Sequence, residues 1–270
     1  MDTILITTLV ITLIGILVGA GLVSTGKLFH VEVDERETAV REALPGNNCG
    51  ACGFAGCDAL AAAIAKGEAP VNSCPVGGAP VTKAIGAIMG TDAEAPEKKV
   101  AFVLCKGSCD VTKNQGNYVG VQDCRTAVLG GIRTADCDHG CLGLGSCVRA
   151  CPENAMRIVD GVAVVDRARC IGCGLCVKAC PKGIIELVPE KQRVIVQCRN
   201  TDKGQTVRKI CKAGCIGCMI CVKQCEFDAI HVVNDLAKID YSKCTQCGKC
   251  VEKCPAKVIT PPAVKLSDPE

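Results

Sequence analysis

Two runs of cysteine with the same spacing constrain this chain more than any other feature of its sequence. Each run has the form Cys-x2-Cys-x2-Cys-x3-Cys-Pro, and the two occupy residues 170–181 and 244–255. Three cysteines at successive short spacings, with a fourth just before proline, are typical of the ligands of a cubane [4Fe-4S] cluster. The pattern therefore predicts a protein that carries electrons one at a time.

The chain holds 25 cysteines among 270 residues, and other uses of cysteine fit this pattern less well. A disulfide framework is typical of short exported chains with an even number of cysteines. Structural zinc also uses Cys-x2-Cys pairs, but the third closely spaced cysteine of each run favours a larger cofactor. Because aromatic residues make up only 2% of the chain, we expect the clusters themselves to fill the cores of small modules.

The N-terminal end predicts a membrane anchor. Residues 4–23 form an uncharged apolar run of 20 residues, which is long enough to cross a bilayer as one helix. A cleaved signal peptide is the alternative, but no Lys or Arg precedes the run. Lys27, Arg36 and Arg41 all follow it, so the positive-inside rule predicts a single pass through the cytoplasmic (inner) membrane with the large C-terminal part in the cytoplasm.

A small iron–sulfur module is predicted at residues 27–90, after the anchor at 1–26. It reads Asn48-Cys49-Gly-Ala-Cys52-Gly-Phe-Ala-Gly-Cys57, followed by Cys74-Pro75. An alanine-rich helix is expected to begin at Cys57, which would place an anionic cluster near the positive end of the helix dipole. A second, weaker helix is expected over residues 81–89. Residues 91–111 are expected to be a linker and the start of a cysteine-bearing segment.

The second half of the chain repeats itself. Nine cysteines, namely Cys124, Cys137, Cys141, Cys147, Cys151, Cys170, Cys173, Cys176 and Cys180, recur 74 residues later as Cys198, Cys211, Cys215, Cys221, Cys225, Cys244, Cys247, Cys250 and Cys254. This offset predicts two tandem ferredoxin-like units, at residues 112–185 and 186–259, followed by a tail at 260–270. Short apolar stretches such as 162–165 are expected to be strands, so the fold class is α+β.

Ligand sets follow from the two-cluster ferredoxin pattern, in which the fourth cysteine of each run binds the cluster of the other run. We therefore predict these sets: Cys49, Cys52, Cys57 and Cys74 (set 1); Cys137, Cys141, Cys147 and Cys180 (set 2); Cys151, Cys170, Cys173 and Cys176 (set 3); Cys215, Cys218, Cys221 and Cys254 (set 4); Cys225, Cys244, Cys247 and Cys250 (set 5).

Set 2 departs from the pattern because Leu144 stands where the second unit has Cys218. Cys137 is predicted to replace the missing ligand, with His139 as a less favoured alternative. Of the cysteines left over, Cys105, Cys109 and Cys124, together with either Cys198 or Cys211, are predicted to hold a sixth cluster. The alternative is five clusters plus structural cysteines.

No residues are arranged for substrate chemistry, because the sequence has neither a nucleophile motif nor a dinucleotide fingerprint. The chain is therefore predicted to be an electron conduit without catalytic residues and without a nucleic-acid partner.

The order of these features resembles the B subunit of the Rnf complex, the ion-translocating ferredoxin:NAD oxidoreductase of bacteria and some archaea. The membrane helix, the Asn48 to Cys57 module with Cys74, and the ferredoxin runs carry the resemblance. It implies a subunit of a translocase that takes electrons from soluble ferredoxin and passes them to membrane and flavin-bearing partner subunits, with NAD reduction coupled to Na⁺ or H⁺ transport. The competing hypotheses are a polyferredoxin serving a hydrogenase or a carbon monoxide dehydrogenase without ion pumping, and a redox-regulatory module.

Overall fold

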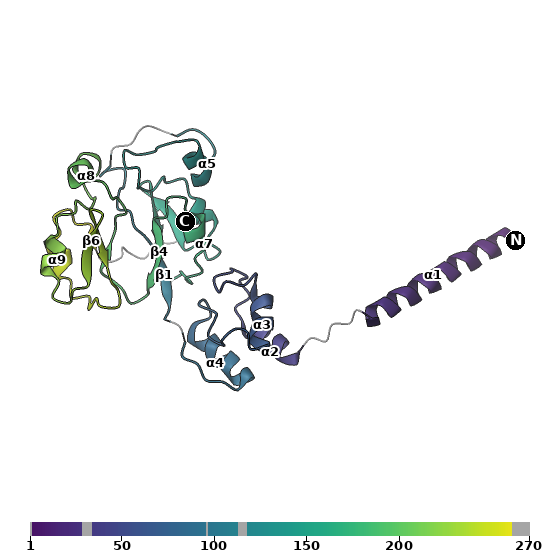
Figure 1. Ribbon diagram of the computed structural model, residues 1–270. Coiled ribbons are helices and arrows are strands. Elements are labelled where there is room, and N and C mark those ends of the chain that lie inside the picture. Colours follow the sequence, from purple (N-terminus) through teal and green to yellow (C-terminus); the bar gives the residue numbers. More distant parts are fainter. Residues whose placement is uncertain (1, 29–33, 96, 113–117, 261–270) are drawn as a thin grey trace.

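The computed structural model describes residues 2–28, 34–95, 97–112 and 118–260. Its first element, α1 (Asp2–Leu28), is a straight helix that stands apart from the other elements in Figure 1. Within α1, Ile4–Thr25 is long and apolar enough to cross a membrane, and none of it is buried in the protein. The hydroxyls of Thr8, Thr12 and Thr25 donate to carbonyls one turn earlier, so these polar groups are satisfied inside the helix.

A three-helix module follows, formed by α2 (Glu35–Ala43), α3 (Cys57–Ala65) and α4 (Gly78–Met89). Its apolar core is small and includes Val40 of α2, Leu60 and Ile64 of α3, and Ile85 of α4. The helix predicted to begin at Cys57 is confirmed. The helix predicted over residues 81–89 is also present but begins three residues earlier, at Gly78.

The first ferredoxin-like unit has two antiparallel two-stranded sheets. In one, β1 (Lys99–Val103) pairs with β4 (Ile185–Pro189); in the other, β2 (Met156–Val159) pairs with β3 (Val162–Val165). The helices are α5 (Cys124–Leu129), α6 (Ser146–Arg149) and α7 (Leu175–Ala179). The strand predicted over 162–165 is confirmed as β3.

The second unit repeats this plan. Its sheets pair β5 (Ile195–Val196) with β8 (Ile259–Thr260), and β6 (Ile230–Val233) with β7 (Leu236–Ile239). The helices are α8 (Gly204–Ile210), α9 (Ile220–Gln224) and α10 (Lys249–Lys253). The structure thus contains the expected membrane-type helix, iron–sulfur module and two tandem ferredoxin-like units of mixed α and β structure (Figure 1).

The limits of the two units differ from the predicted ones. Strand β1 lies inside the predicted linker at 91–111, yet its pairing with β4 makes it part of the first unit. The predicted boundary between 185 and 186 would also cut through β4. The reason is physical: the outer strands are short and acquire a partner only when the two ends of a unit meet. Of the predicted tail at 260–270, only Thr260 belongs to the described residues.

Backbone conformation gives an independent record of the duplication. Residues with left-handed φ recur at the same offset in both units, in these pairs: Gly143 and Gly217, Gly145 and Met219, Asn154 and Asp228, Asp160 and Asn234, Gly161 and Asp235, Gly172 and Gln246, Gly174 and Gly248, Gly183 and Lys257. Few non-glycine residues adopt this conformation without a constraint from the fold. The loops that carry the cysteines therefore follow the same path in both copies.

The two units also share contacts. Val100, Phe102 and Val188 of the first unit form one buried cluster with Ile195 of the second, against which Tyr241 packs. Beside this cluster, Arg199 forms an ion pair with Glu186 across the junction. The units are therefore joined by packed side chains.

Candidate iron–sulfur sites

The first site lies at the start of α3. Cys57 is the first residue of that helix, and its N–H donates to Asn48 Oδ1 at 2.8 Å, which holds the preceding loop against the helix. Burial raises the pKa of the Cys74 thiol, and the nearby charges of Cys52 and Cys57 raise it further. The structure thus brings these three predicted ligands together, with Cys49 in the adjoining loop. Ligation by the four residues stays a prediction.

The second unit brings its two predicted four-cysteine sets together. One cavity is lined by Cys215, Cys218, Cys221 and Cys254, which are the members of set 4. Another is lined by Cys225, Cys244, Cys247 and Cys250, which are the members of set 5. The fourth cysteine of each run thus lies at the site of the other run, which is the exchange expected for a two-cluster unit.

Set 3 of the first unit has the same arrangement. Burial raises the pKa of the Cys176 thiol to about 12, with further contributions from Cys170, Cys173, Cys147 and Cys151. Cys151 Sγ accepts a hydrogen bond from Ala155 N at 3.3 Å, and its repeat, Cys225 Sγ, accepts one from Ala229 N at 3.4 Å. Such N–H donors to thiolate sulfur are among the factors that set the potential of a cluster.

Set 2 is where the structure differs from the sequence-based assignment. Burial raises the pKa of the Cys147 thiol to about 12, and the charges that raise it further belong to Cys141, Cys180 and Cys124. Burial likewise raises the pKa of the Cys141 thiol, and the charges of Cys124 and Cys180 raise it further. Cys137, which was predicted to complete this set, lines a cavity with Cys105, Cys198 and Cys211, and of set 2 only Cys141 also borders this cavity. The fourth thiol near Cys141, Cys147 and Cys180 is therefore that of Cys124.

The elements around Cys124 explain this placement. Cys124 begins α5, and its N–H donates to Ser146 Oγ at 2.8 Å at the start of α6; Ser146 Oγ in turn donates to Asp123 Oδ2 at 2.8 Å. Leu144, which stands in place of a ligand, is buried and packs against Ala127 of α5. Leu144, which stands in place of a cysteine ligand, thus helps to hold α5, and α5 supplies Cys124 to the same group. Asp123 as a helix cap was the available sequence signal for this helix.

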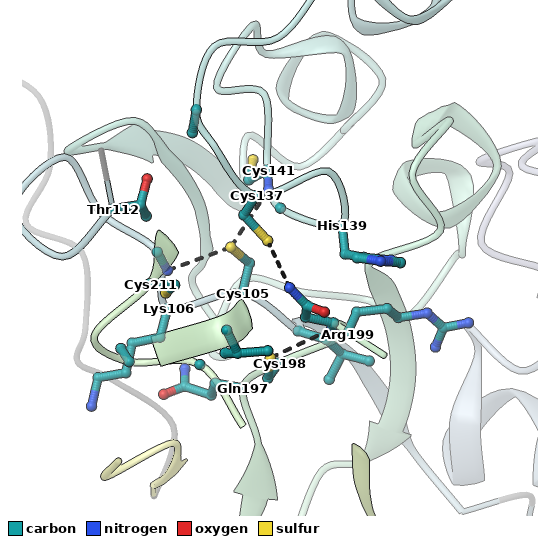
Figure 2. A pocket seen from close by; sticks show the side chains of 18 residues that line it. Cys105, Lys106, Thr112, Cys137, His139, Cys141, Gln197, Cys198, Arg199 and Cys211 are labelled. Carbon is teal, nitrogen blue, oxygen red and sulfur yellow. Dashed lines mark hydrogen bonds between the residues drawn. The ribbon is translucent and has the colours of Figure 1, made fainter. Parts of the chain in front are cut away.

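The predicted sixth set is not brought together. Cys124 belongs to the group just described, and Cys109 is exposed, with its N–H bonded to Asp160 O at 3.0 Å. Cys105 and the two proposed alternatives, Cys198 and Cys211, do share one cavity with Cys137 (Figure 2). The side chain of His139 also borders this cavity, but Figure 2 shows its ring directed away from the sulfur atoms, and its Nε2 lies 3.6 Å from Asp202 Oδ1.

The constant offset of 74 residues does not align the structural counterparts at one point. Cys198 follows β5, and the strand equivalent to β5 is β1, which is followed by Cys105. Cys105 Sγ accepts from Cys141 N at 3.5 Å, and Cys198 Sγ accepts from Cys215 N at 3.4 Å. Because Cys141 and Cys215 are repeats of each other, Cys105 is the structural counterpart of Cys198. The match between Cys124 and Cys198 is a coincidence of spacing.

Several thiols of these sites are buried and close to one another. Burial raises the pKa of the Cys105 thiol to about 12, and those of Cys198, Cys221 and Cys250 to about 11. Several buried thiolates so close together repel one another unless cations lie between them. Among the described residues, no three His, Cys, Asp or Glu side chains are arranged around a single metal ion. Groups of four cysteines with this spacing fit a larger cofactor with several irons.

Comparison with protein families agrees with this chemistry. Residues 44–76 match the FeS family, described as "Putative Fe-S cluster". Residues 136–184 match one 4Fe-4S dicluster domain family, and residues 169–230 and 214–259 match a second family with that description. The chain therefore contains [4Fe-4S] cluster domains.

Three relatives are similar over most of the chain. The B subunit of the Na(+)-translocating ferredoxin:NAD(+) oxidoreductase complex of Acetobacterium woodii is 48% identical over 96% of this chain and 78% of its own length. The B subunit of the ion-translocating oxidoreductase complex of Methanosarcina acetivorans is 44% identical over 91% of this chain and 94% of its own. The B subunit of the proton-translocating ferredoxin:NAD(+) oxidoreductase complex of Clostridium ljungdahlii is 42% identical over 96% of this chain and 93% of its own.

Proposed function

Because this chain belongs to the family of B subunits of ion-translocating ferredoxin:NAD oxidoreductase (Rnf) complexes, we propose that it accepts electrons from soluble reduced ferredoxin and conducts them to its partner subunits. It is a membrane-associated electron-transfer subunit with [4Fe-4S] clusters. Since its relatives in Acetobacterium woodii and Clostridium ljungdahlii are named for Na⁺ and for protons, the partner subunits are proposed to determine which ion moves.

The observation that carries this proposal is the closeness of successive cysteine sets: Cys173 of set 3 and Ala51, which lies between two cysteines of set 1, line one cavity. The pKa of Cys173, in set 3, is raised by burial and then by the charge of Cys49, in set 1. Cys176 of set 3 lies in turn near Cys147 of set 2. Electron transfer needs cofactors in sequence and close together, and these sets form such a sequence from the three-helix module into the first ferredoxin-like unit.

We propose four of the predicted ligand sets unchanged and revise the fifth. Sets 1, 3, 4 and 5 keep their predicted members. Set 2 becomes Cys124, Cys141, Cys147 and Cys180, supported by the group around Cys147. Five clusters are thus proposed within the individual modules, each with four cysteine ligands.

The position in the membrane is also a proposal. Helix α1 would anchor the chain by a single pass, and the cluster-bearing part would face the cytoplasm, where ferredoxin is found. Its support is the presence of Lys27, Arg36 and Arg41 after the apolar run.

The test of function uses membrane vesicles from cells that lack this chain. Such vesicles should lose ferredoxin-dependent NAD⁺ reduction, and expression of the full chain should restore it. A Cys173→Ala variant, which lacks one ligand of set 3, should restore less than one tenth of the rate. The exposed Cys109 offers a matched control, because Cys109→Ala removes a thiol outside all five sets and should restore the full rate.

Two outcomes would contradict the proposal. Vesicles without the chain that retain the rate would show that electrons do not pass through it. Loss of hydrogenase or carbon monoxide dehydrogenase activity, with ferredoxin:NAD⁺ activity intact, would support a carrier role outside the ion-translocating complex.

A further inference from the structure

Five proposed clusters use twenty cysteines, and four of the five others line one cavity between the two ferredoxin-like units. We propose that Cys105, Cys137, Cys198 and Cys211 hold a further [4Fe-4S] cluster, which relays electrons from the first unit to the second. This inference rests on the proposed function for its role as a relay. The existence of the cluster stands on the geometry alone.

The cavity resembles the sites of the ferredoxin runs in the number of cysteine donors that line it. Like the cavities lined by set 4 and by set 5, it is lined by four cysteines that belong to no other proposed set. Figure 2 shows Cys105, Cys137, Cys198 and Cys211 around one space, with Cys141 of set 2 at its edge. Because two cavities lined by four cysteines have the spacing of cubane clusters, the third has a matching set of ligands for one.

Hydrogen bonds to sulfur are the second independent feature of the site. Cys105 Sγ accepts from Gly107 N at 3.4 Å, and Cys198 Sγ accepts from Asn200 N, also at 3.4 Å. Cys137 Sγ accepts from the side-chain amide of Asn200 at 3.4 Å. Amide donors directed at sulfur stabilise the negative charge of a cluster and its thiolate ligands.

Each unit supplies two of the four ligands from equivalent positions. Cys105 and Cys198 follow the equivalent strands β1 and β5. Cys137 and Cys211 each accept, at the carbonyl, a hydrogen bond from the glycine three residues later, Gly140 and Gly214. The site therefore has the pseudo-twofold symmetry of the duplication, and neither unit forms it alone.

The backbone at the junction holds the two halves of the site together. Thr112 of the first unit forms a β-bridge with Cys211 of the second, and Lys212 N donates to Val111 O at 2.9 Å. Lys106 and Arg199 also border the cavity, where the Lys106 ammonium donates to Lys257 O at 3.1 Å and Arg199 pairs with Glu186.

The position of the site makes it a relay. Cys141 of set 2 donates its N–H to Cys105 Sγ, and Cys215 of set 4 donates its N–H to Cys198 Sγ. One hydrogen bond thus connects each side of the site to a ligand of a neighbouring cluster. The order of clusters becomes set 1, set 3, set 2, the junction site, set 4 and set 5.

The first experiment measures iron, sulfide and zinc in the full chain, purified without oxygen. The wild type should contain about 24 irons per chain, corresponding to six cubanes. Cys211→Ala should lose about 4 irons and 4 sulfides, and Cys109→Ala should lose none. About 20 irons in the wild type, or one zinc per chain that disappears in Cys211→Ala, would overturn the proposed cluster. Either result would leave the other five clusters and the proposed function intact.

Double variants show which cysteines share a site. Cys105→Ala with Cys211→Ala should lose the same 4 or so irons as either single variant, because both belong to one cluster. Cys124→Ala with Cys137→Ala should lose about 8, because they belong to two. A loss of about 8 irons in the first double variant and about 4 in the second would place Cys137 in set 2, and it would overturn the proposed cluster between the two units. EPR signals of the remaining clusters show that each variant is folded.

A second variant leaves all ligands in place. Asn200→Leu removes the side-chain donor to Cys137 Sγ, so the iron content should stay unchanged while the potential of one cluster falls. No shift in any potential would contradict the placement of Asn200 beside a cluster. The relay itself is tested in vesicles, where Cys211→Ala should lower ferredoxin-dependent NAD⁺ reduction at least tenfold. An unchanged rate in a variant that has lost the 4 irons would overturn the relay.

Discussion

Gly172, which lies between two proposed ligands of set 3, lets β1 approach the cysteine loop closely because it has no Cβ atom. Its φ is +70°, and a Cβ atom there would lie 2.2 Å from the carbonyl oxygen of Lys99. The repeat position in the second unit is Gln246, with φ of 61°, so the left-handed backbone alone does not require glycine. The close approach of β1 does, and it lets Ala101 N donate to Cys170 Sγ at 3.3 Å.

Gly172→Ala should therefore displace β1 and weaken the site of set 3. The matched control is Gly183→Ala, which has φ of +60° and no atom within 4 Å of the added Cβ. Both variants share about 1–2 kcal/mol of backbone strain, but only Gly172→Ala adds about 1–3 kcal/mol of overpacking. The rate of iron release to a chelator should rise much more in Gly172→Ala; equal rates in the two variants would contradict this explanation.

Gln192 is a buried side chain that contacts a cluster ligand. Its Nε2 donates to Cys244 Sγ at 3.5 Å and to Val194 O at 2.8 Å. Gln192→Leu removes a hydrogen bond that favours the more negative reduced cluster, so one midpoint potential should fall by about 20–60 mV, which corresponds to about 0.5–1.5 kcal/mol. An EPR-monitored redox titration measures it. Gln205→Leu, on the exposed face of α8, is the control and should shift no potential.

At the scale of elements, α5 decides the ligands of set 2. The loops that contain Leu144 and Cys218 have the same backbone, since Gly143 and Gly217 have φ of 72° and 63°, and Gly145 and Met219 have φ of 74° and 58°. A cysteine placed at position 144 should therefore reach the same cluster that Cys124 reaches from α5.

This equivalence predicts a rescue. Cys124→Ser should lose about 4 irons per chain, and adding Leu144→Cys should restore them, because the second unit uses a ligand at that position. Iron and sulfide analysis with EPR measures both steps. Leu144→Ser in the same background is the control and should restore nothing. If Cys124→Ser loses no iron, Cys124 is not a ligand and the revised set is wrong.

At the scale of the whole molecule, the membrane-type segment of α1 does not pack against the cluster-bearing modules. None of its candidate membrane segment is buried in the protein, so the cluster modules do not depend on it for packing. Two arginines near the middle of the segment, Ile14→Arg and Leu17→Arg, should cost about 5–7 kcal/mol of insertion energy in total.

We expect this double variant, expressed without partner subunits, to move from the membrane fraction to the soluble fraction with its iron content unchanged. Ultracentrifugation followed by iron analysis measures both properties. Ile14→Leu with Leu17→Ile keeps the apolar character and should stay with the membranes. A soluble wild-type chain would show that α1 is not the anchor.

The sequence by itself determined the iron–sulfur chemistry of this protein and most of the ligand sets that we propose. Cubane ligation requires short cysteine spacings, and a duplication leaves a constant offset, so sets 1, 3, 4 and 5 can be predicted from local patterns. The apolar length of the N-terminal segment is likewise a local property. The family resemblance rests on these same features, and the relatives confirm it.

Only the tertiary structure decided where Cys105, Cys124 and Cys137 lie. Cys124 reaches set 2 because α5 packs on Leu144, and Cys105 meets Cys198 across the junction because β1 and β5 are equivalent strands. The first unit also carries extra chain between Cys105 and Cys141, 36 residues against 17 between Cys198 and Cys215, so a constant offset misaligns the counterparts there. Contacts between residues far apart in sequence leave no spacing pattern, because the fold alone brings them together.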